Sequence, residues 1–515
     1  MGLVNQVGRR RFRARFAMLA LYGILTLGAL TTLYPFAMMM VTGFKGPTDQ
    51  NDNSLVPRFW SEVDSKDPKT GKLAPESLMG KYLADKYAGD ASMIESTRIG
   101  ADATPEQVAA YEKTLMQLPL SGFYAGFRTA PTQSTSRLAM RYQNWLRGKF
   151  ATIDDLNKAY YEENPAFETV QAPVELLERR AWQPPKSRKY EDWLTFKAEL
   201  PAEFRVPLRI NRLWQEFMRS QCENQFDRVP EFYKKSATKF EELKIVRSGD
   251  VFRRFIGALP ARPLMDISGT EGDYPIAAFE TSFVKTHEAE IKREFTTRNY
   301  RYVGNYMALN GRALINTAIF CALAILTQLI VNPLAAFALS RFPMKSTGRI
   351  LLFLLATMAF PAEVAMIPSF LLLKQLGLLN TFAALVLPTA ASGYMIFLLK
   401  GFFDSLPPEL FESGQIDGAK ESTLMFKIAF PMSRPVLGYL ALIAFMGAYG
   451  AFLYAFLVAQ DQKIWTIMVF IYQLQNTAPK AVMMAALTLA ALPTLLVFLV
   501  AQRAIMRGII VPGEK

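Results

Sequence analysis

Apolar residues in this chain are gathered into six long runs, one near the N-terminus and five in the C-terminal part. A helix needs about 20 apolar residues to cross the hydrocarbon core of a bilayer, and each run is close to that length. Core helices of a large soluble protein are a poor alternative for so many long runs. The pattern predicts an all-α polytopic membrane protein with six transmembrane helices, at 16–41, 314–339, 350–373, 382–399, 436–458 and 482–501.

The first apolar run follows a cluster of arginines, an order of charge and apolar core that a signal peptide also shows. The run is longer than a signal-peptide core and stays apolar beyond Pro35. We therefore interpret it as a retained helix.

A long polar segment, the insert, separates the first two runs and divides the chain into 1–44, the insert 45–312, and 313–515. The insert contains five tryptophans, and aromatic residues in that number usually form a core, so we expect a folded domain rather than a linker. Its local signals are mostly helical, including a capping box at Thr104 and Gln107. The expected helices are 104–118, 152–161, 190–200 and 208–222, with an irregular stretch and short strands at 257–276. Five tryptophans fall in the insert: Trp60, Trp145, Trp182, Trp193 and Trp214.

The charge distribution supports a membrane topology rather than nucleic-acid binding. The chain has 58 Lys and Arg against 45 Asp and Glu, but the insert is nearly balanced, so most of the excess lies beside the apolar runs. Basic residues favour the cytoplasmic side of membrane proteins. The bias predicts that both termini are cytoplasmic and that the insert is extracytoplasmic. The segments expected inside hold Arg341, Lys345, Arg349, Lys400, Lys420, Lys427, Arg434, Arg503, Arg507, Lys515 and the N-terminal arginines.

Five prolines lie in the C-terminal apolar runs, where they typically mark kinks. Glu363 lies between Pro361 and Pro368, about 20 Å along its run from Ile350 at ~1.5 Å per residue. A carboxylate at that depth is costly unless it faces water, so Glu363 is a candidate for the translocation path. The alternative is a side chain near the outer interface. The other three prolines are Pro333, Pro388 and Pro493.

The chain turns polar between 400 and 435, where apolar residues recur at spacings of short amphipathic helices. Pro408 and Glu409 suit a helix start, and Gly418 suits a turn that separates two helices. Pro431 and Pro435 are expected to stop the second helix before the next run begins. An ordinary amphipathic loop is the alternative.

This loop carries a spaced motif: Glu412-Ser413-Gly414, then Asp417-Gly418-Ala419, then, after nine residues from Gly418, Ile428-Ala429-Phe430-Pro431. The motif resembles the cytoplasmic coupling loop (the "EAA" loop) of ABC-importer permeases. Residues from about 305 onward resemble the permeases of maltose-type and multiple-sugar importers. Ser413 and Gly414 replace the usual alanines, Phe430 replaces a leucine, and the first outer loop is usually short in that family. Further matches are Asn305-Tyr306, Asn316-Thr317, 337–342, Ile367-Pro368, 376–378 and Asn380-Thr381.

The resemblance implies the type I permease fold of ABC importers in the bacterial cytoplasmic (inner) membrane. It implies a permease subunit that forms half of a pore for a sugar or oligosaccharide. The implied partners are a second permease subunit, two copies of a cytoplasmic ABC ATPase and an extracytoplasmic solute-binding protein, with no cofactor. The tail 508–515 is also expected near the ATPases. The implied ATPase contact comprises Glu412, Ser413, Gly414, Asp417, Gly418, Ala419, Phe426, Ile428 and Pro431.

No catalytic or metal-binding pattern competes with this interpretation. The single His287, with two separated cysteines, does not make a zinc site, and no Walker-type run is present. The alternative is a membrane-anchored carbohydrate-binding or glycoside-hydrolase-like extracytoplasmic domain. It depends on a short resemblance to β-galactosidase-like glycoside hydrolases, but no opposed carboxylate pair can be assigned. The residues concerned are Trp145-Leu146, Phe150, Leu156-Asn157 and Tyr160.

Overall fold

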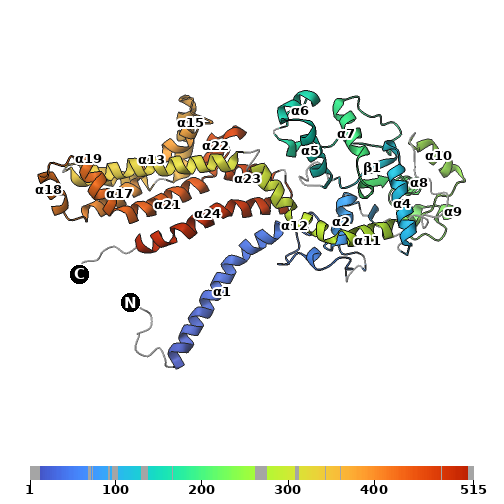
Figure 1. Cartoon of the computed structure of the whole chain (residues 1–515), viewed down its shortest axis with the longest axis horizontal. Coiled ribbons are helices and arrows are strands. Elements are labelled where there is room, and N and C mark those ends of the chain that lie inside the picture. Colours follow the sequence, from blue (N-terminus) through green and yellow to red (C-terminus); the bar gives the residue numbers. More distant parts are fainter. Residues whose placement is uncertain are drawn as a thin grey trace. The chain divides into compact units, whose positions relative to one another are not determined.

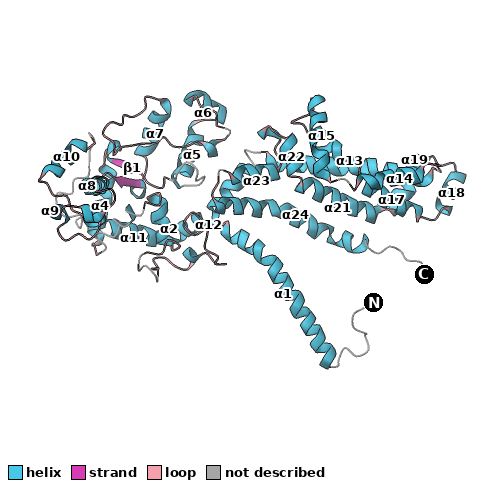
Figure 2. Ribbon diagram, turned by 180° about the vertical axis from the view of Figure 1, so that it is seen from behind, coloured by secondary structure: helices cyan, strands magenta, loops and turns pink. Residues whose placement is uncertain are grey.

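A computed structural model describes residues 12–67, 71, 73–90, 93–94, 102–128, 137–164, 166–260, 275–307, 312–342, 344–359, 361–476 and 478–508. The chain divides into two compact units. The first comprises Met1–Tyr302 with Thr477–Ala485, and the second comprises Val303–Asn476 with Ala486–Lys515. The described residues form helices and loops apart from one two-stranded sheet. Figure 1 labels the elements, and Figure 2 colours them by secondary structure.

The first unit begins with helix α1 (Phe12–Thr42) and continues through the insert. Strands β1 and β2 pair antiparallel, with Phe123 opposite Pro207. The longer elements are α2 (Leu78–Lys86), α4 (Pro105–Gln117), β1 (Phe123–Ala125), α5 (Arg137–Lys149), α6 (Ile153–Tyr160), α7 (Arg188–Ala198), β2 (Arg205–Pro207), α8 (Ile210–Gln221), α9 (Glu231–Lys234), α10 (Asp250–Ala258), α11 (Ile276–Thr286) and α12 (Glu288–Asn305). Short 3-10 turns lie at Arg58–Trp60, Leu120–Gly122, Phe167–Thr169, Ala202–Phe204, Phe226–Arg228 and Phe240–Glu242.

The helical signals of the insert are confirmed. Thr104 caps α4 in a capping box with Gln107, and Thr152 accepts a hydrogen bond from the Asp155 amide at the start of α6. Helices α7 and α8 cover the other two predicted segments. The irregular stretch predicted at 257–276 falls mostly outside the described residues. The two strands lie elsewhere and were not predicted.

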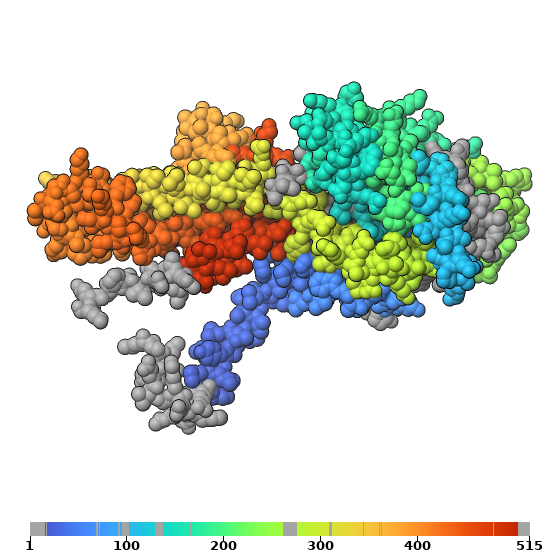
Figure 3. All heavy atoms as spheres, in the orientation of Figure 1, coloured from blue at the N-terminus to red at the C-terminus, as the bar shows by residue number. Residues whose placement is uncertain are grey.

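Aromatic residues form the core of the insert, as expected. Trp193 is fully buried and its ring centroid lies 5.4 Å from that of Tyr142. Trp214 is also fully buried, in a second cluster with Phe255 at 5.1 Å. Trp60, by contrast, is 38% exposed. In the space-filling view, the atoms of α5 and α7 form one closely packed body (Figure 3).

The short segment that resembles glycoside hydrolases belongs to this core. Leu146 on α5 and Leu156 on α6 are fully buried. The Tyr160 hydroxyl donates to Asp192 Oδ2 at 2.8 Å. Packing between α5, α6 and α7 therefore accounts for these residues without a catalytic role.

The second unit contains the C-terminal apolar runs. Helix α13 packs along α17 and α21, and the polar loop lies between α17 and α21 in the chain. The elements are α13 (Ala313–Arg341), α14 (Thr347–Thr357), α15 (Ala362–Gln375), α16 (Phe382–Val386), η9 (Leu387–Thr389), α17 (Gly393–Asp404), α18 (Glu409–Ile416), α19 (Glu421–Thr423), the π-helix η10 (Leu424–Ala429), α20 (Phe430–Met432), α21 (Arg434–Gly450), α22 (Leu453–Val458), η11 (Gln462–Ile464), α23 (Ile467–Gln475) and α24 (Lys480–Gly508), which begins in the first unit.

Among the residues that the structure describes, three helices, α1, α13 and α24, are long and apolar enough to cross a membrane. Two bent pairs raise the number to five if each pair is one span: α16 with α17 at 50°, and the helical segment Glu421–Met432 with α21 at 81°. Six spans therefore stay a prediction.

Several predicted runs are divided into two shorter helices rather than forming one continuous helix. The sequence analysis expected kinks at the prolines of these runs, and two of the divisions lie beside Pro361 and Pro388. The run 350–373 is divided between α14 and α15, where Pro361 stands at the N-cap of α15. The run 382–399 is interrupted at η9, which contains Pro388. Proline lacks an amide hydrogen and disturbs the preceding helical turn, so both breaks have a local cause. The run 436–458 is divided between α21, which ends at Gly450, and α22.

Candidate functional site: the loop between α17 and α21

Helix α18 ends in a glycine turn that the sequence predicted. Gly418 has φ +77°. Its amide donates to the Gln415 carbonyl at 3.0 Å, and the Ala419 amide donates to the Gly414 carbonyl at 2.9 Å. This pair of hydrogen bonds is the Schellman motif, which places a left-handed residue just after the helix. Glycine adopts that conformation without a steric penalty.

Gly414 is the point at which α18 rests on the following helical segment. A Cβ atom added there would lie 2.6 Å from Leu424 Cδ2 and 3.4 Å from Ile428 Cδ1. Leu424 is only 1% exposed and belongs to a core cluster with Ala429. The backbone of α18 therefore contacts η10 directly, and the two short helices form one packed hairpin.

The hairpin is attached to the end of α13. The Arg341 guanidinium lies over the ring of Phe411, with Cζ 3.6 Å from the ring centroid. Its Nη2 also donates to the Phe403 carbonyl on α17 at 2.7 Å. Ser340 donates to Asp404 Oδ1 at 2.7 Å. Since Phe411 is buried, displacement of α18 would strain contacts with α13 and α17.

The outer face of the hairpin combines acidic and apolar side chains. Glu412 and Asp417 are exposed. Ile416 is 86% exposed and Phe426 is 58% exposed, although both are large apolar residues. Exposed apolar side chains mark an interaction site where they form a contiguous patch, so Ile416 and Phe426 are candidates for such a surface.

The structure divides the predicted site residues into two groups. Gly414, Ala419 and Ile428 pack inside the hairpin, whereas Glu412, Ser413, Asp417 and Phe426 are exposed. Pro431 lies in α20 and is partly buried. The sequence analysis did not single out Ile416 as a surface residue, because it is one of several apolar residues in this loop. The role of Arg341 was also missed, because no local pattern links it to α18.

The second candidate site lies on α15. Pro361 is its N-cap, Glu363 stands in its first turn, and Pro368 lies inside the helix. Glu363 is exposed in the second unit, as are Val364 at 61% and Ile367 at 65%. This exposed face suits either a lipid-facing or a pore-facing position, so the path assignment stays a prediction.

Buried amides on α13 bind backbone groups where neighbouring helices are interrupted. Asn332 is fully buried, and its Oδ1 accepts from the Ser392 amide at 2.8 Å, just after the break at η9. Asn316 Nδ2 donates to the carbonyls of Lys463 and Trp465 at 2.9 and 3.0 Å. A bilayer offers no water to such groups, so internal partners are required.

Within the ranges that the structure describes, no group of three or more His, Cys, Asp or Glu side chains could hold a metal ion. The two cysteines, Cys222 and Cys321, are both buried and free.

Comparison with known proteins defines the class of this chain. Residues 305–511 match the family described as binding-protein-dependent transport system inner membrane component. The chain belongs to this family: it is a membrane component of a transport system and not an enzyme.

Two relatives that are named as transport system permease proteins, UgpE and YtcP, agree with this assignment. The sn-glycerol-3-phosphate transport system permease protein UgpE of Shigella flexneri is 32% identical over 40% of this chain and 75% of its own length. Protein LplC of Bacillus subtilis is 29% identical, covering 43% of this chain and 80% of LplC. The polygalacturonan/rhamnogalacturonan transport system permease protein YtcP of Bacillus subtilis is 27% identical over 44% of this chain and 84% of its length. A crystal structure of a bacterial ABC transporter involved in alginate import matches with 22% identity, covering 40% of this chain and 78% of that chain, at a TM-score of 0.36.

Proposed function

We propose that this chain is the permease subunit of an ATP-driven ABC importer for a sugar or oligosaccharide. Family membership supports the transport role. The solutes named for UgpE and YtcP, sn-glycerol 3-phosphate and polygalacturonan/rhamnogalacturonan, support a polyhydroxylated substrate. The chain would form half of the pore beside a second permease subunit. Two ATPase copies and an extracytoplasmic solute-binding protein would complete the importer.

The observation that carries the mechanism is the hairpin of α18 and η10. A compact hairpin that is held at Phe411 and exposes Ile416 and Phe426 can transmit a push, whereas a flexible loop would absorb it. ATPase closure would move this hairpin, and α13 and α17 would follow through Arg341. Helices then tilt between inward-open and outward-open states.

The test is recovery of the ATPase with this chain from membranes in mild detergent, identified by mass spectrometry. Ile416→Asp places a charge on the exposed apolar face and should abolish recovery. Leu376→Asp is the matched control. Leu376 is an aliphatic side chain of the same size as Ile416 and is 60% exposed, but it lies at the end of α15, away from the hairpin in the chain. It should leave recovery unchanged.

Two outcomes contradict the proposal. If the wild-type chain is recovered alone and stably folded, the interpretation as a membrane-anchored extracytoplasmic domain gains support. If both aspartate variants recover the ATPase equally well, the contact lies elsewhere on the chain.

The proposed topology has six spans, cytoplasmic termini and a periplasmic insert that contacts the solute-binding protein. In this proposal the two bent pairs and the shorter apolar helix α14 would supply the additional spans. Reporter fusions test it: a periplasm-active reporter placed at Tyr161, which is 95% exposed in the insert, should be active. Activity of a cytoplasmic reporter at the same position would reverse the topology.

We retain Glu363 as a residue of the translocation path, with Pro361 and Pro368 shaping its helix. A carboxylate on a mainly apolar membrane helix is costly unless it contacts water or a partner. Glu363→Ala should alter uptake kinetics while expression stays normal. Unchanged kinetics would remove this role.

A further inference from the structure

The loop that follows α1, residues 43–60, exposes large apolar side chains. Leu55, Val56 and Trp60 are exposed. Phe59, by contrast, is fully buried and holds this stretch on the core of the insert. Exposed apolar side chains that are close together on a rigid segment mark a candidate contact surface.

The loop is closed onto the end of α1 by a buried lysine. Lys45 lies just after α1, and its ammonium donates to the carbonyls of Asp52 and Ser54 at 2.5 and 2.9 Å. Because Ser54 directly precedes Leu55, the exposed apolar residues are held close to the point where α1 ends. The loop is therefore ordered before any partner binds, which lowers the entropic cost of binding.

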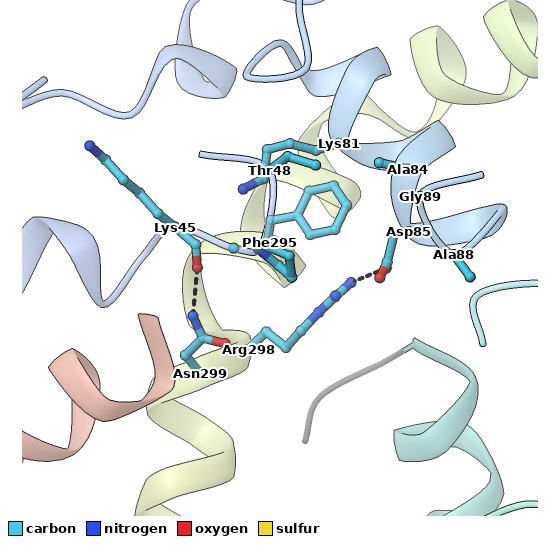
Figure 4. A pocket seen from close by; sticks show the side chains of 12 residues that line it. Lys45, Thr48, Lys81, Ala84, Asp85, Ala88, Gly89, Phe295, Arg298 and Asn299 are labelled. Carbon is cyan, nitrogen blue, oxygen red and sulfur yellow. Dashed lines mark hydrogen bonds and ion pairs between the residues drawn. The ribbon is translucent and has the colours of Figure 1, made fainter. Parts of the chain in front are cut away.

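The start of the loop is fixed in turn to α12. Asn299 Nδ2 donates to the carbonyls of Gly43 and Lys45 at 3.0 and 2.7 Å, and Figure 4 shows the second of these hydrogen bonds. The Tyr300 hydroxyl donates to the Met40 carbonyl, in the last turn of α1, at 2.7 Å. These hydrogen bonds join α1, the loop and the insert, so the height of the loop follows the height at which α1 leaves the membrane.

Aromatic side chains surround this junction. The ring centroid of Phe44 lies 4.9 Å from that of Tyr300 and 5.7 Å from that of Trp60. The Trp60 indole donates to Thr296 Oγ1 at 2.9 Å, so its polar atom has a partner while part of its ring stays exposed. Trp and Tyr, which combine a polar atom with an apolar ring, are enriched where membrane helices pass through the headgroup region.

Two candidate membrane spans end at this loop. The span Met18–Thr42 in α1 has 25 residues, which gives about 38 Å at ~1.5 Å per residue, whereas the hydrocarbon core is ~30 Å thick. Its last residues therefore lie in the headgroup region. The span Lys480–Gln502 in α24 begins beside the same loop, since Lys480 Nζ donates to Asn51 Oδ1 at 3.5 Å. Both spans thus place the loop at the surface of the bilayer.

We propose that Leu55, Val56 and Trp60 insert into the headgroup region of the phospholipid bilayer and seat the insert on the membrane surface. The bilayer surrounds the ends of membrane spans, so lipid is the partner that this position favours over a soluble protein. The inference requires that α1 crosses the membrane. It depends neither on the ATPase nor on the transported solute.

The experiment is electron paramagnetic resonance on the nitroxide-labelled full-length chain in phospholipid nanodiscs. Val56→Cys carries the label on the loop. Val174→Cys is the matched control at an exposed valine elsewhere in the insert, and Leu25→Cys marks the exposed surface of α1. Cys222 and Cys321 are buried, so the unmodified chain gives the background labelling. Collisions of the label with O2, which concentrates in lipid, are compared with collisions with nickel-EDDA, which stays in water.

The ratio of O2 collisions to nickel-EDDA collisions at Val56 should be several times that at Val174 and lower than that at Leu25. Leu55→Cys should give the same result at a second position, and thermal unfolding reports whether each variant folds. A ratio at Val56 equal to that at Val174 places the loop in water and overturns the inference. Low collision rates with both reagents also overturn it, because a protein partner such as the second permease subunit then covers the loop.

The reference label on α1 separates this inference from the proposed topology. A ratio at Leu25 equal to that at Val174 places α1 outside the bilayer, and both the inference and the six-span topology then fail. A lipid-like ratio at Leu25 with a water-like ratio at Val56 overturns only the inference. Neither result changes ATPase recovery, so the permease proposal is tested separately.

Discussion

Replacement of Gly414 tests whether the hairpin is seated by direct backbone contact. An added Cβ would lie 2.6 Å from Leu424 Cδ2, whereas favourable carbon contacts begin at about 3.5 Å. Leu424 is 1% exposed, so its methyl group is surrounded by other core atoms and has little room to move. Gly414→Ala therefore requires a shift in the packed interface, and Gly414→Leu requires separation of α18 from η10.

The expected change in the free energy of unfolding follows from two opposing effects. Overpacking a core by a methyl group costs about 1–3 kcal/mol. Alanine regains about 1 kcal/mol over glycine inside a helix. The net cost of Gly414→Ala is then about 0–2 kcal/mol. Leucine adds three more carbons to the same space, so Gly414→Leu should reach about 3 kcal/mol or more.

The assay compares Gly414→Leu with Gly401→Leu. Gly401 is an exposed glycine of α17, and a Cβ there would meet nothing within 4 Å. The unfolding temperature in detergent and the amount of ATPase recovered should both be lower for Gly414→Leu and stay near the wild-type values for Gly401→Leu. Equal behaviour of the two variants would refute the contact.

A double-mutant cycle examines the same contact without a large side chain. Leu424→Val shortens the group that opposes the new methyl, so Gly414→Ala should cost less in its presence. Residues in contact show interaction energies of about 0.5–3 kcal/mol. If the two effects add to within about 0.5 kcal/mol, Gly414 and Leu424 do not touch.

Three further predictions concern other parts of the structure. Gly418→Val should lower the free energy of unfolding by about 1–2 kcal/mol through its φ of +77° alone, because a Cβ added there would have no atom within 4 Å. Gly418→Asn should lower it less in the same unfolding assay, and equal losses for the two variants would contradict this explanation. Arg341→Lys should lower stability by about 1 kcal/mol and weaken ATPase recovery, since lysine keeps the charge but not the planar contact with Phe411; an unchanged variant would remove the anchoring role. Lys197→Met leaves Glu175 buried without its ion-pair partner and should cost about 3–5 kcal/mol, whereas Lys197→Met with Glu175→Leu should recover most of it; a double variant as unstable as the single one would disagree.

Features set by a few neighbouring residues could be predicted from the sequence. The capping box of Thr104 and Gln107 and the turn at Gly418 depend on hydrogen bonds that span only a few residues. Both were predicted at the correct residues. The burial of Trp193 and Trp214 was also predictable, since large aromatic side chains need a core.

Features that depend on distant residues could not be predicted in the same way. Arg341 and Phe411 are separated along the chain by α14 to α17, and no spacing rule connects them. Ile416 and Phe411 are both apolar residues of α18, but Phe411 is buried beneath Arg341 of α13 whereas Ile416 is 86% exposed. Helix α23 was missed because its apolar run is too short to indicate a span.

The broken helices show why hydropathy alone could not describe the membrane part. Mean hydropathy measures composition, and a run divided by Pro361 or Pro388 is as apolar as an unbroken one. In a bilayer, each break leaves backbone groups that cost several kcal/mol if they lack partners. Asn332 accepts a hydrogen bond from the backbone just after η9, and Asn316 donates one to the backbone before α23. Both asparagines lie on the continuous helix α13. A polar residue inside a long apolar run therefore carries information about interruptions in neighbouring helices, which a hydropathy average removes.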